Sequence, residues 1–372
     1  MRILVLGGYG GTGRLFCRYL LEETPADVIV GGQNRQKAEE WAEQLKMECP
    51  PDRISARHVD ASDRDSLREA FRSIDLVLVA ATTTQFAAQI AEAALDAHID
   101  YLDIYYQQSV YPVLETLRQR ISESGQCFIT QAGFHPGLPA ALIRKGATYF
   151  DTYDRAIVAF AMAARIEKPE SVYELVDALS DYKADVFKEG QWRRATYNDA
   201  VKIDFGSRFG VSRCVPLDMV EIRNIPEMYR LRDVCVYSAG FNWFVDYLIF
   251  PLIVLSQMIR KGALRHFWAQ ALVWGMNHVS RGEEGLVFLL HAAGGKDGNH
   301  REVDIRCEHR SAYAFTVIPV IALLKQYLDG SIRKPGLWMM GHIVDPDRLL
   351  GDMGRMGVDV QTSVSHLTAR VA

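Results

Sequence analysis

Short apolar runs and longer stretches with helical periodicity alternate along the first 133 residues of the chain. Each run is rich in β-branched residues and precedes a polar or glycine-containing turn, which is typical of a strand. We predict strands near Ile3–Leu6, Val28–Val30, Ile54–His58, Leu76–Ala80, Tyr101–Ile104 and Cys127–Thr130. Helices are predicted near Thr12–Glu23, Arg35–Leu45, Arg64–Ser73, Gln85–Asp96 and Val110–Ser124. Because parallel strands need crossover helices, this alternation predicts a doubly wound α/β domain with a parallel sheet covered on both faces.

The pattern changes after Gly133, where strands are expected without a regular helix between each pair. The predicted strands are Ala156–Ala163, Arg193–Thr196, Val201–Phe205, Met219–Arg223, Gly285–His291 and His300–Cys307. Residues 294–299 have the composition of a hairpin turn between the last two. Helices are expected over Ala314–Leu328, despite Pro319, and over Asp345–Met353. This part of the chain therefore predicts an α+β domain built on a mixed sheet.

The length and composition indicate a folded protein of more than one domain. The chain has 372 residues, of which 49% are hydrophobic and 24% are charged, as in ordinary globular proteins. Lys and Arg total 42 against 46 Asp and Glu, which gives a net charge of −4. A weakly acidic chain without a concentrated basic stripe is poorly suited to neutralising phosphates. Nucleic acid is therefore not expected as a partner.

The cysteines and the start of the chain bear on the compartment. The cysteines stand at positions 17, 49, 127, 214, 235 and 307 and form no CxxC pair. We therefore expect reduced, mostly buried thiols, no metal site and a cytoplasmic protein. The apolar run that follows Arg2 ends at Gly7 and is too short for the core of a signal peptide.

Residues 241–255 form a strongly apolar segment that Pro251 interrupts. The segment is shorter than the roughly 20 residues that a membrane-spanning helix needs, so no transmembrane span is expected. It is apolar nearly all round, which is typical of a buried helix. We expect a domain core or a subunit interface. The alternative is a peripheral membrane or lipid contact, or the wall of an apolar substrate site.

A glycine-rich segment, residues 7–14, follows the first predicted strand directly and opens the first helix. Gly8, Gly10 and Gly13 satisfy the pattern GxGxxG, which gives a tight turn, close approach of the backbone to a pyrophosphate and close helix–sheet packing. The helix N-terminus adds free N–H groups and the positive end of its dipole. This context predicts a dinucleotide site formed by Gly8, Gly10, Gly11, Thr12 and Gly13. The alternative is a glycine turn that packs tightly and binds nothing.

Two other glycine motifs fit less well. Gly7, Gly10 and Gly13 have the GxxGxxG spacing of short-chain dehydrogenases, but none of the 16 tyrosines has the lysine four residues on that those enzymes usually carry. Gly8 and Gly13 also have the spacing of the phosphate-binding loop of nucleoside triphosphatases. There, Arg14-Leu15 replaces the Lys-Ser/Thr pair, which removes the hydroxyl that binds magnesium.

The end of the second strand favours NADP(H) over NAD. Residues 30–37 contain no carboxylate, the group that binds the ribose hydroxyls in NAD-dependent proteins. Arg35 is placed to pair with a 2′-phosphate through charge-assisted hydrogen bonds. We therefore interpret Asn34 and Arg35 as the residues that recognise NADP(H). The alternative is that Arg35 is a solvated residue of the first helical turn.

Ligands of open α/β sheets bind outside the carboxyl ends of the strands, so residues just past each strand are candidates for the site. By this topology Asp60 and Ala61, after the third strand, approach the adenine of a dinucleotide. Ala81 and Thr82, after the fourth strand, approach its nicotinamide.

Two residues past the fifth and sixth strands are the catalytic candidates. His135 is a candidate because an imidazole titrates near neutral pH and can move the proton that accompanies hydride transfer. Tyr105 is a candidate because a phenol can supply the same proton. The alternatives are that His135 caps the helix that Pro136 begins and that Tyr105 is a packing aromatic.

Four segments of the chain resemble the saccharopine dehydrogenase family of NADP-binding oxidoreductases. They are Gly8–Arg14, Tyr101-Leu102-Asp103, Gly133–Pro139 and Lys334-Pro335-Gly336-Leu337-Trp338. The resemblance implies a Rossmann domain at residues 1–134 and a substrate and dimerisation domain on a mixed sheet at 135–340. It also implies a C-terminal return of residues 341–372 to the Rossmann domain, and a homodimer.

The resemblance implies an NADP-dependent oxidoreductase that transfers hydride to or from a C–N bond of an amino-acid-like small molecule. Two segments depart from the family pattern, residues 104–108 after Tyr-x-Asp and Met339–His342, where an acidic residue is common. Both argue against an amino-dicarboxylate substrate. One alternative is an enoyl-type reductase of a lipid-like substrate. The other is a non-catalytic dinucleotide-binding protein that docks a partner or a lipid.

Overall fold

The computed structural model describes residues 1–165, 172–173, 175–176, 183–260, 262, 264–279 and 284–367. The chain divides into two compact units. The first unit consists of Met1–Ala141 and Tyr313–Met356, and the second of Leu142–Ala312 and Gly357–Ala372. The boundaries predicted from the sequence lie after residues 134 and 340.

The first unit is built on a seven-stranded sheet in the order β15-β6-β5-β4-β1-β2-β3, and every strand pair in it is parallel. The strands are β1 (Arg2–Leu6), β2 (Asp27–Gly32), β3 (Ile54–His58), β4 (Leu76–Val79), β5 (Asp100–Asp103), β6 (Cys127–Thr130) and β15 (Gly336–Met339). The doubly wound sheet and its six predicted strands are confirmed. The seventh strand, β15, joins the edge at β6 from the C-terminal part of the chain.

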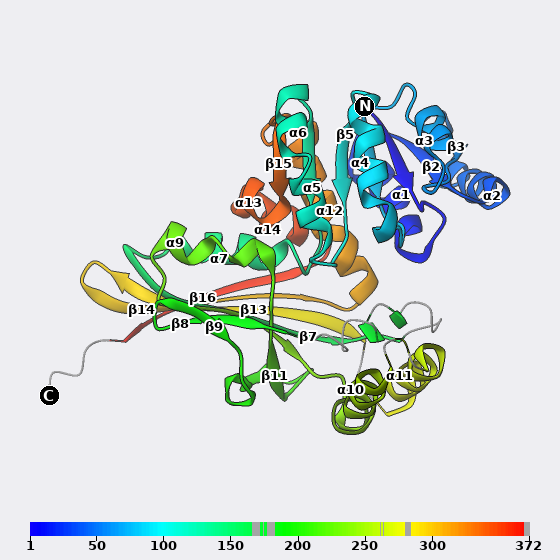
Figure 1. The fold of residues 1–372 in the computed structure, drawn as a ribbon. Helices are drawn as coiled ribbons and strands as arrows, with labels where there is room; N and C mark the ends of the chain where they lie inside the picture. Colours follow the sequence, from blue (N-terminus) through cyan, green and yellow to red (C-terminus); the bar gives the residue numbers. More distant parts are fainter. Residues whose placement is uncertain are drawn as a thin grey trace, which may run out of the picture. The chain divides into compact units, whose positions relative to one another are not determined.

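Helices connect the strands of this sheet, and α1 and α4 lie beside it in Figure 1. The helical elements are α1 (Gly11–Glu23), α2 (Arg35–Lys46), η1 (Pro51–Arg53), α3 (Arg64–Ala70), η2 (Thr84–Phe86), α4 (Ala87–Asp96), α5 (Val110–Glu115) and α6 (Arg118–Ser124). The helix predicted over 110–124 is interrupted between α5 and α6. There the Thr116 hydroxyl donates to the Val113 carbonyl at 2.7 Å, which competes with the helical backbone bonds.

The C-terminal part of the first unit contains α12 (Ala312–Leu328), α13 (Met340–Ile343) and α14 (Pro346–Arg355). The helices predicted over 314–328 and 345–353 are confirmed as α12 and α14. The helix α7 (Leu138–Ala147) follows β6 and contains the boundary between the units. One apolar core of this unit joins buried residues of β4, including Val77 and Val79, to Ile90 and Ala91 of α4.

The second unit is built on a mixed sheet in the order β10-β11-β12-β7-β13-β14-β16; in addition, β8 pairs with β12 and β9 pairs with β8. Its strands are β7 (Thr152–Ala163), β8 (Asp185–Lys188), β9 (Gln191–Arg194), β10 (Val201–Asp204), β11 (Val211–Leu217), β12 (Asp233–Ala239), β13 (Gly285–Lys296), β14 (Asn299–His309) and β16 (Asp359–Leu367). β12 and β7 are parallel, whereas the other pairs are antiparallel. The predicted mixed sheet is confirmed.

The structure corrects the sequence analysis at one predicted strand of this sheet. Residues 219–223 do not form a strand but contain the 3-10 turn η5 (Val220–Ile222). The hairpin of β13 and β14 turns at Asp297 and Gly298, both with positive φ, so its strands are longer than predicted. The predicted C-terminal return spans residues 341–372, but from Gly357 onward the chain belongs to the second unit, because β16 pairs with β14.

Further helical elements in the described part of the second unit are η4 (Tyr197–Asp199), α9 (Ile225–Tyr229), the π-helical turn η6 (Val245–Ile249), α10 (Phe250–Ile259) and α11 (Arg265–Val279). We call residues 241–260 and 264–279, which contain η6, α10 and α11, the helical hairpin; α10 and α11 lie side by side in it (Figure 1). The apolar segment 241–255 therefore forms half of a helical hairpin. Among the described residues no helix is long and apolar enough to cross a membrane.

Candidate functional site

The glycine turn between β1 and α1 is held by backbone contacts. The Gly7 and Gly8 amides donate to the Gly31 carbonyl of β2, both at 2.9 Å, and the Gly10 amide donates to the Gly7 carbonyl at 2.9 Å. A Cβ atom on Gly13 would lie 2.0 Å from the Gly7 carbonyl oxygen. Only glycine at position 13 lets α1 start this close to the turn.

At the N-terminus of α1, no side chain caps the backbone N–H groups. Gly10 precedes the first turn without a capping side chain, and that turn carries no acidic residue. Gly10 and Gly11 are exposed, and a Cβ atom on Gly11 would meet no atom within 4 Å. Thr12 is half-buried beside them. Free N–H groups at the positive end of a helix dipole, next to open space, fit the pyrophosphate of a dinucleotide.

The predicted recognition residues lie at the end of β2. The Asn34 side chain caps α2 by accepting from the Lys37 amide at 2.9 Å, so its oxygen already has a structural role. Arg35 is exposed, and its Nε donates to Glu39 Oε1 at 2.8 Å. An ion pair this exposed is weak and leaves the guanidinium available to a phosphate.

Tyr9 in the glycine turn is a site residue that the sequence analysis missed. Its hydroxyl accepts a hydrogen bond from the Asn34 amide at 3.0 Å, and its ring lies against Gly32, where a Cβ atom would be 2.3 Å from Cε1. The Arg14 side chain donates from Nε to the Tyr9 carbonyl at 2.9 Å. Tyr9 therefore ties the glycine turn to the recognition end of β2. In the sequence, the only sign that the Tyr9 ring packs this closely on β2 is Gly32, two residues before Asn34.

Asp60 and Ala61 lie directly beyond β3. Asp60 accepts from the Gln33 side chain at 2.9 Å and from the Ser62 amide and hydroxyl at 2.9 and 2.7 Å. These hydrogen bonds, that of the Ser62 hydroxyl first, lower the pKa of Asp60, so it is a fixed carboxylate. The Ala61 carbonyl accepts from the Gln89 side chain at 2.9 Å. The ends of β2 and β3 are thus joined through Gln33.

Ala81 and Thr82 lie just past β4, and Ala81 contacts the glycine turn. A Cβ atom on Gly7 would lie 2.8 Å from Ala81 Cβ. Thr82 is exposed. The next residue, Thr83, has its hydroxyl 2.7 Å from the Tyr105 hydroxyl. The Tyr105 phenol, a predicted catalytic group, therefore lies near the glycine turn, at the carboxyl ends of the strands.

A buried carboxylate supports the ends of β5 and β6. Asp103 accepts from the Tyr105 amide at 3.2 Å and from the Gln131 amide at 3.1 Å. Burial raises the pKa of Asp103 to about 6, although Thr130, Tyr101 and the two amides favour its ionised form and oppose that shift. Asp103 positions the backbone on which Tyr105 stands. The sequence analysis noted the residue but gave it no such role.

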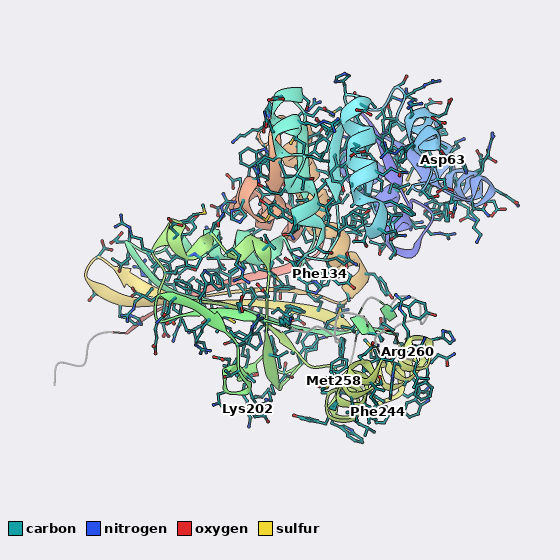
Figure 2. The ribbon with its side chains drawn as sticks, in the orientation of Figure 1. Asp63, Phe134, Lys202, Phe244, Met258 and Arg260 are labelled. Atoms are coloured by element: carbon teal, nitrogen blue, oxygen red, sulfur yellow. The ribbon has the colours of Figure 1, made fainter. Side chains whose placement is uncertain are left out.

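His135 stands among aromatic rings. It stacks on Phe134, with ring centroids 4.4 Å apart, and lies parallel to Tyr106 at 6.4 Å; Figure 2 labels Phe134. Desolvation lowers the pKa of His135 to about 4, so the imidazole is neutral at physiological pH. A neutral imidazole can accept a proton or donate a hydrogen bond, but it has no positive charge with which to hold a substrate.

The comparisons with known proteins agree with this geometry. Residues 3–129, from β1 into β6, match the family described as the saccharopine dehydrogenase NADP binding domain. The apo structure of saccharopine dehydrogenase (L-Glu forming) from Saccharomyces cerevisiae is similar with a TM-score of 0.74 and 14% identity, covering 98% of this chain and 99% of that chain. A putative myo-inositol dehydrogenase from Sinorhizobium meliloti covers 95% of this chain and 94% of its own at 10% identity, but its TM-score of 0.46 supports no argument. No curated protein matches the chain.

These findings define the class of protein. The first unit contains a domain that matches the saccharopine dehydrogenase NADP binding domain. This match confirms the prediction of NADP as the cofactor. Residues 3–129 are similar to the NADP-binding domain of saccharopine dehydrogenase, and the chain has the fold of the yeast enzyme; both findings support an NAD(P)-dependent oxidoreductase.

Arg35→Ala is expected to lower the ratio of NADPH to NADH affinity about tenfold, because it removes one exposed charge-assisted contact with the 2′-phosphate. Titration of the purified protein with each nucleotide measures the ratio. Glu39→Gln is the matched control, since it removes the partner of Arg35 and leaves the guanidinium in place. It should keep or raise the preference for NADPH. An unchanged ratio in Arg35→Ala would remove Arg35 from the site.

Asp103 should make the protein less stable as the pH rises from about 4 to about 6. Its pKa is higher in the folded state than in the unfolded chain, so ionisation favours unfolding by about 3 kcal/mol once both states are ionised. Urea unfolding at several pH values should show that Asp103→Asn lacks this decline. Asp199→Asn is the control: Arg193 holds the pKa of Asp199 well below its usual range, so its effect should stay constant above about pH 4. Parallel curves for wild type and Asp103→Asn would contradict the prediction.

Proposed function

We propose that the chain transfers hydride between NADP(H) and a C–N bond of an amino-acid-like substrate. The proposal is carried by the convergence of the glycine turn, the loop after β4 and the Tyr105 phenol at one edge of the first sheet. Bound NADP(H) would supply or take up the hydride at that edge. The similarity to saccharopine dehydrogenase over 98% of the chain supports the choice of a C–N bond.

The protein residues have three kinds of role in this proposal. Gly10, Gly11 and Thr12 offer backbone N–H groups to the pyrophosphate, and Arg35 pairs with the 2′-phosphate. Tyr105 and His135 are the proton-transfer candidates. Because the pKa of His135 lies near 4, it would act as a neutral acceptor over the physiological pH range.

Nucleotide binding is the first test of the proposal. The freshly purified protein is denatured, any released nucleotide is identified by mass spectrometry, and the apo form is titrated with NADPH and NADH. Recovered NADP(H), or a clear NADPH preference, leads to a screen of NADPH oxidation with imines or with pairs of an oxo acid and an amine. Binding of neither nucleotide would overturn the proposal.

A lipid-like enoyl substrate is the second candidate, because the helical hairpin exposes a large apolar surface. Enoyl thioesters or enoyl lipids in the same screen separate the two substrate classes. Turnover with enoyl compounds alone would replace the C–N proposal.

The proton-transfer role is tested by Tyr105→Phe and His135→Gln. A general acid or base is typically worth about 10²–10⁴ in rate, so the variant that loses about a hundredfold or more identifies the group. A variant within about threefold of wild type excludes its residue, since positioned acid–base groups contribute far more than that. NADPH affinity, measured for each variant, shows whether the cofactor site is intact.

A further inference from the structure

Arg14, next to the glycine turn, is a cation without an assigned role. It stands in the first turn of α1, directly after Gly13, and is exposed. Its Nε donates to the Tyr9 carbonyl at 2.9 Å, and its guanidinium carbon lies 4.6 Å from the centroid of the Trp41 ring of α2. Trp41 is itself only 9% exposed, so the ring is a fixed support. The guanidinium is therefore held in one place between α1 and α2.

The Arg14 guanidinium keeps hydrogen-bond donors that the protein does not use. Within the described residues, Nε makes the only hydrogen bond of this side chain, and no carboxylate pairs with it. Arg53 shows the contrasting case of a structural brace. Its three nitrogens all donate to backbone carbonyls, those of Leu21, Thr24 and Ala26. Both Nη groups of Arg14, each with two N–H donors, are instead available to a ligand.

Tyr9 connects Arg14 with the end of β2. The Tyr9 carbonyl accepts from Arg14, and the Tyr9 hydroxyl accepts from the Asn34 amide at 3.0 Å. In dinucleotide-binding folds, the ribose 2′ position of the adenosine is recognised at the end of the second strand. Tyr9 is thus the single residue between Arg14 and the place where a 2′-phosphate binds.

The corner formed by the β1–α1 and β2–α2 turns has a positive potential. The segments that build it, residues 1–21 and 28–38, contain no Asp or Glu. The first turns of α1 and α2 carry no acidic side chain, so the positive ends of both helix dipoles add to the charge of the arginines. Such a corner favours a doubly charged anion.

Two carboxylates are linked to the end of β2, and both have partners there. Glu39 Oε1 accepts from Arg35 Nε at 2.8 Å. Asp60 accepts from the Gln33 side chain at 2.9 Å, and it stands at the end of β3, on the side of β2 that faces away from β1. Neither carboxylate pairs with Arg14, whose charge is left for a ligand.

We propose that Arg14 is a second binding residue for the 2′-phosphate of NADP(H), with its Nη groups donating to the phosphate oxygens. Trp41 and the Tyr9 carbonyl hold the guanidinium in place, and Arg35 contacts the same phosphate from α2. A side chain that is already fixed loses less entropy on binding, so Arg14 contributes at least as much as Arg35 to the preference for NADPH. Because the proposed function places NADP(H) at the glycine turn, this role of Arg14 rests on it.

The test is calorimetric titration of the full-length apo protein with NADPH and NADH, and with adenosine 2′,5′-bisphosphate and adenosine 5′-monophosphate. Arg14→Gln should weaken binding of the two ligands with a 2′-phosphate about tenfold or more, the effect of one charge-assisted contact. Binding of the two ligands without it should change by less than about twofold, because they offer that contact no phosphate. Arg14→Lys should fall between wild type and Arg14→Gln, since lysine keeps the charge but not the planar fork.

Arg18→Gln is the matched control. Arg18 lies one turn later on α1 and pairs with Glu48 at 2.7 Å, so the variant makes the same change of charge away from the end of β2. It should bind all four ligands as wild type does.

The binding data separate three other outcomes. An equal loss for NADPH and NADH in Arg14→Gln would show that Arg14 only braces α1 against α2, and an unchanged NADPH affinity would exclude the contact; either result overturns the proposal. If circular dichroism shows that Arg14→Gln does not fold, Arg14→Lys decides by the same comparison. A wild-type protein that binds neither nucleotide would overturn the proposed function itself, and this role of Arg14 with it.

Discussion

Gly13→Ala should weaken NADPH binding by about two orders of magnitude, because a displacement of about 1 Å at a positioned site can cost about 10²-fold. The added Cβ atom would lie 2.0 Å from the Gly7 carbonyl oxygen and 2.8 Å from its carbonyl carbon. Both contacts are with backbone, so no side-chain rotation can relieve them. The start of α1 must move away from the turn. Its N–H groups then no longer point to the same place.

The same substitution should also lower the free energy of unfolding by about 3 kcal/mol, the upper part of the usual range for overpacking. Calorimetric titration with NADPH and urea unfolding measure the two effects separately.

Gly11→Ala is the control for this prediction. It makes the same chemical change in the first turn of the same helix, where a Cβ atom meets nothing within 4 Å. Its unfolding free energy should stay within about 1 kcal/mol of wild type, since alanine is the better helix former. If Gly13→Ala and Gly11→Ala were equally stable, α1 would not contact the glycine turn as described.

The first unit was predictable because its signals are local. Most strands from β1 to β6 contain a short apolar run followed by a turn, and the glycine motif stands where a strand meets a helix. β15 was not predictable in this way. Its four residues, Gly336–Met339, join the sheet only through pairing with β6, more than 200 residues earlier.

The second unit was harder to predict because several of its strands lack continuous apolar runs. β11 contains Pro216 and is largely half-exposed, and β16 consists mostly of exposed short polar residues. Their positions depend on partners far away in the chain rather than on their own pattern. Residues 220–223 alternate apolar and polar side chains like a strand, but Val220–Ile222 fold as a 3-10 turn.

The same difference between local sequence signals and long-range contacts applies to the residues of the candidate site. Glycines and an arginine near the end of a strand can be recognised by spacing, whereas the roles of Tyr9 and Asp103 follow from contacts with Asn34 and Gln131. The catalytic candidates, the homodimer and the cytoplasmic location stay predictions.

Asp100→Ala should lower the free energy of unfolding by about 3 kcal/mol, because it leaves buried polar partners without their carboxylate. Asp100 is buried at the start of β5. Its Oδ2 accepts from the Tyr327 hydroxyl at 2.5 Å and from Arg333 Nε at 2.8 Å. Its Oδ1 accepts from the Cys127 amide at 2.8 Å. One carboxylate therefore joins β5, β6 and the C-terminal segment of the first unit. The half-exposed Arg333 places the effect at the lower end of the range for buried ion pairs.

The loss should be concentrated where the C-terminal segment meets the sheet. Hydrogen exchange is expected to rise in β15, whose pairing with β6 follows directly after Arg333. Asp329→Ala is the matched control: Asp329 pairs with Arg348 in the same C-terminal segment, but both side chains are substantially exposed. Removing an exposed pair should cost at most about 1 kcal/mol and leave β15 protected. Equal losses in the two variants would show that the carboxylate at position 100 does not hold β15 to the sheet, and that strand pairing alone fixes the C-terminal segment.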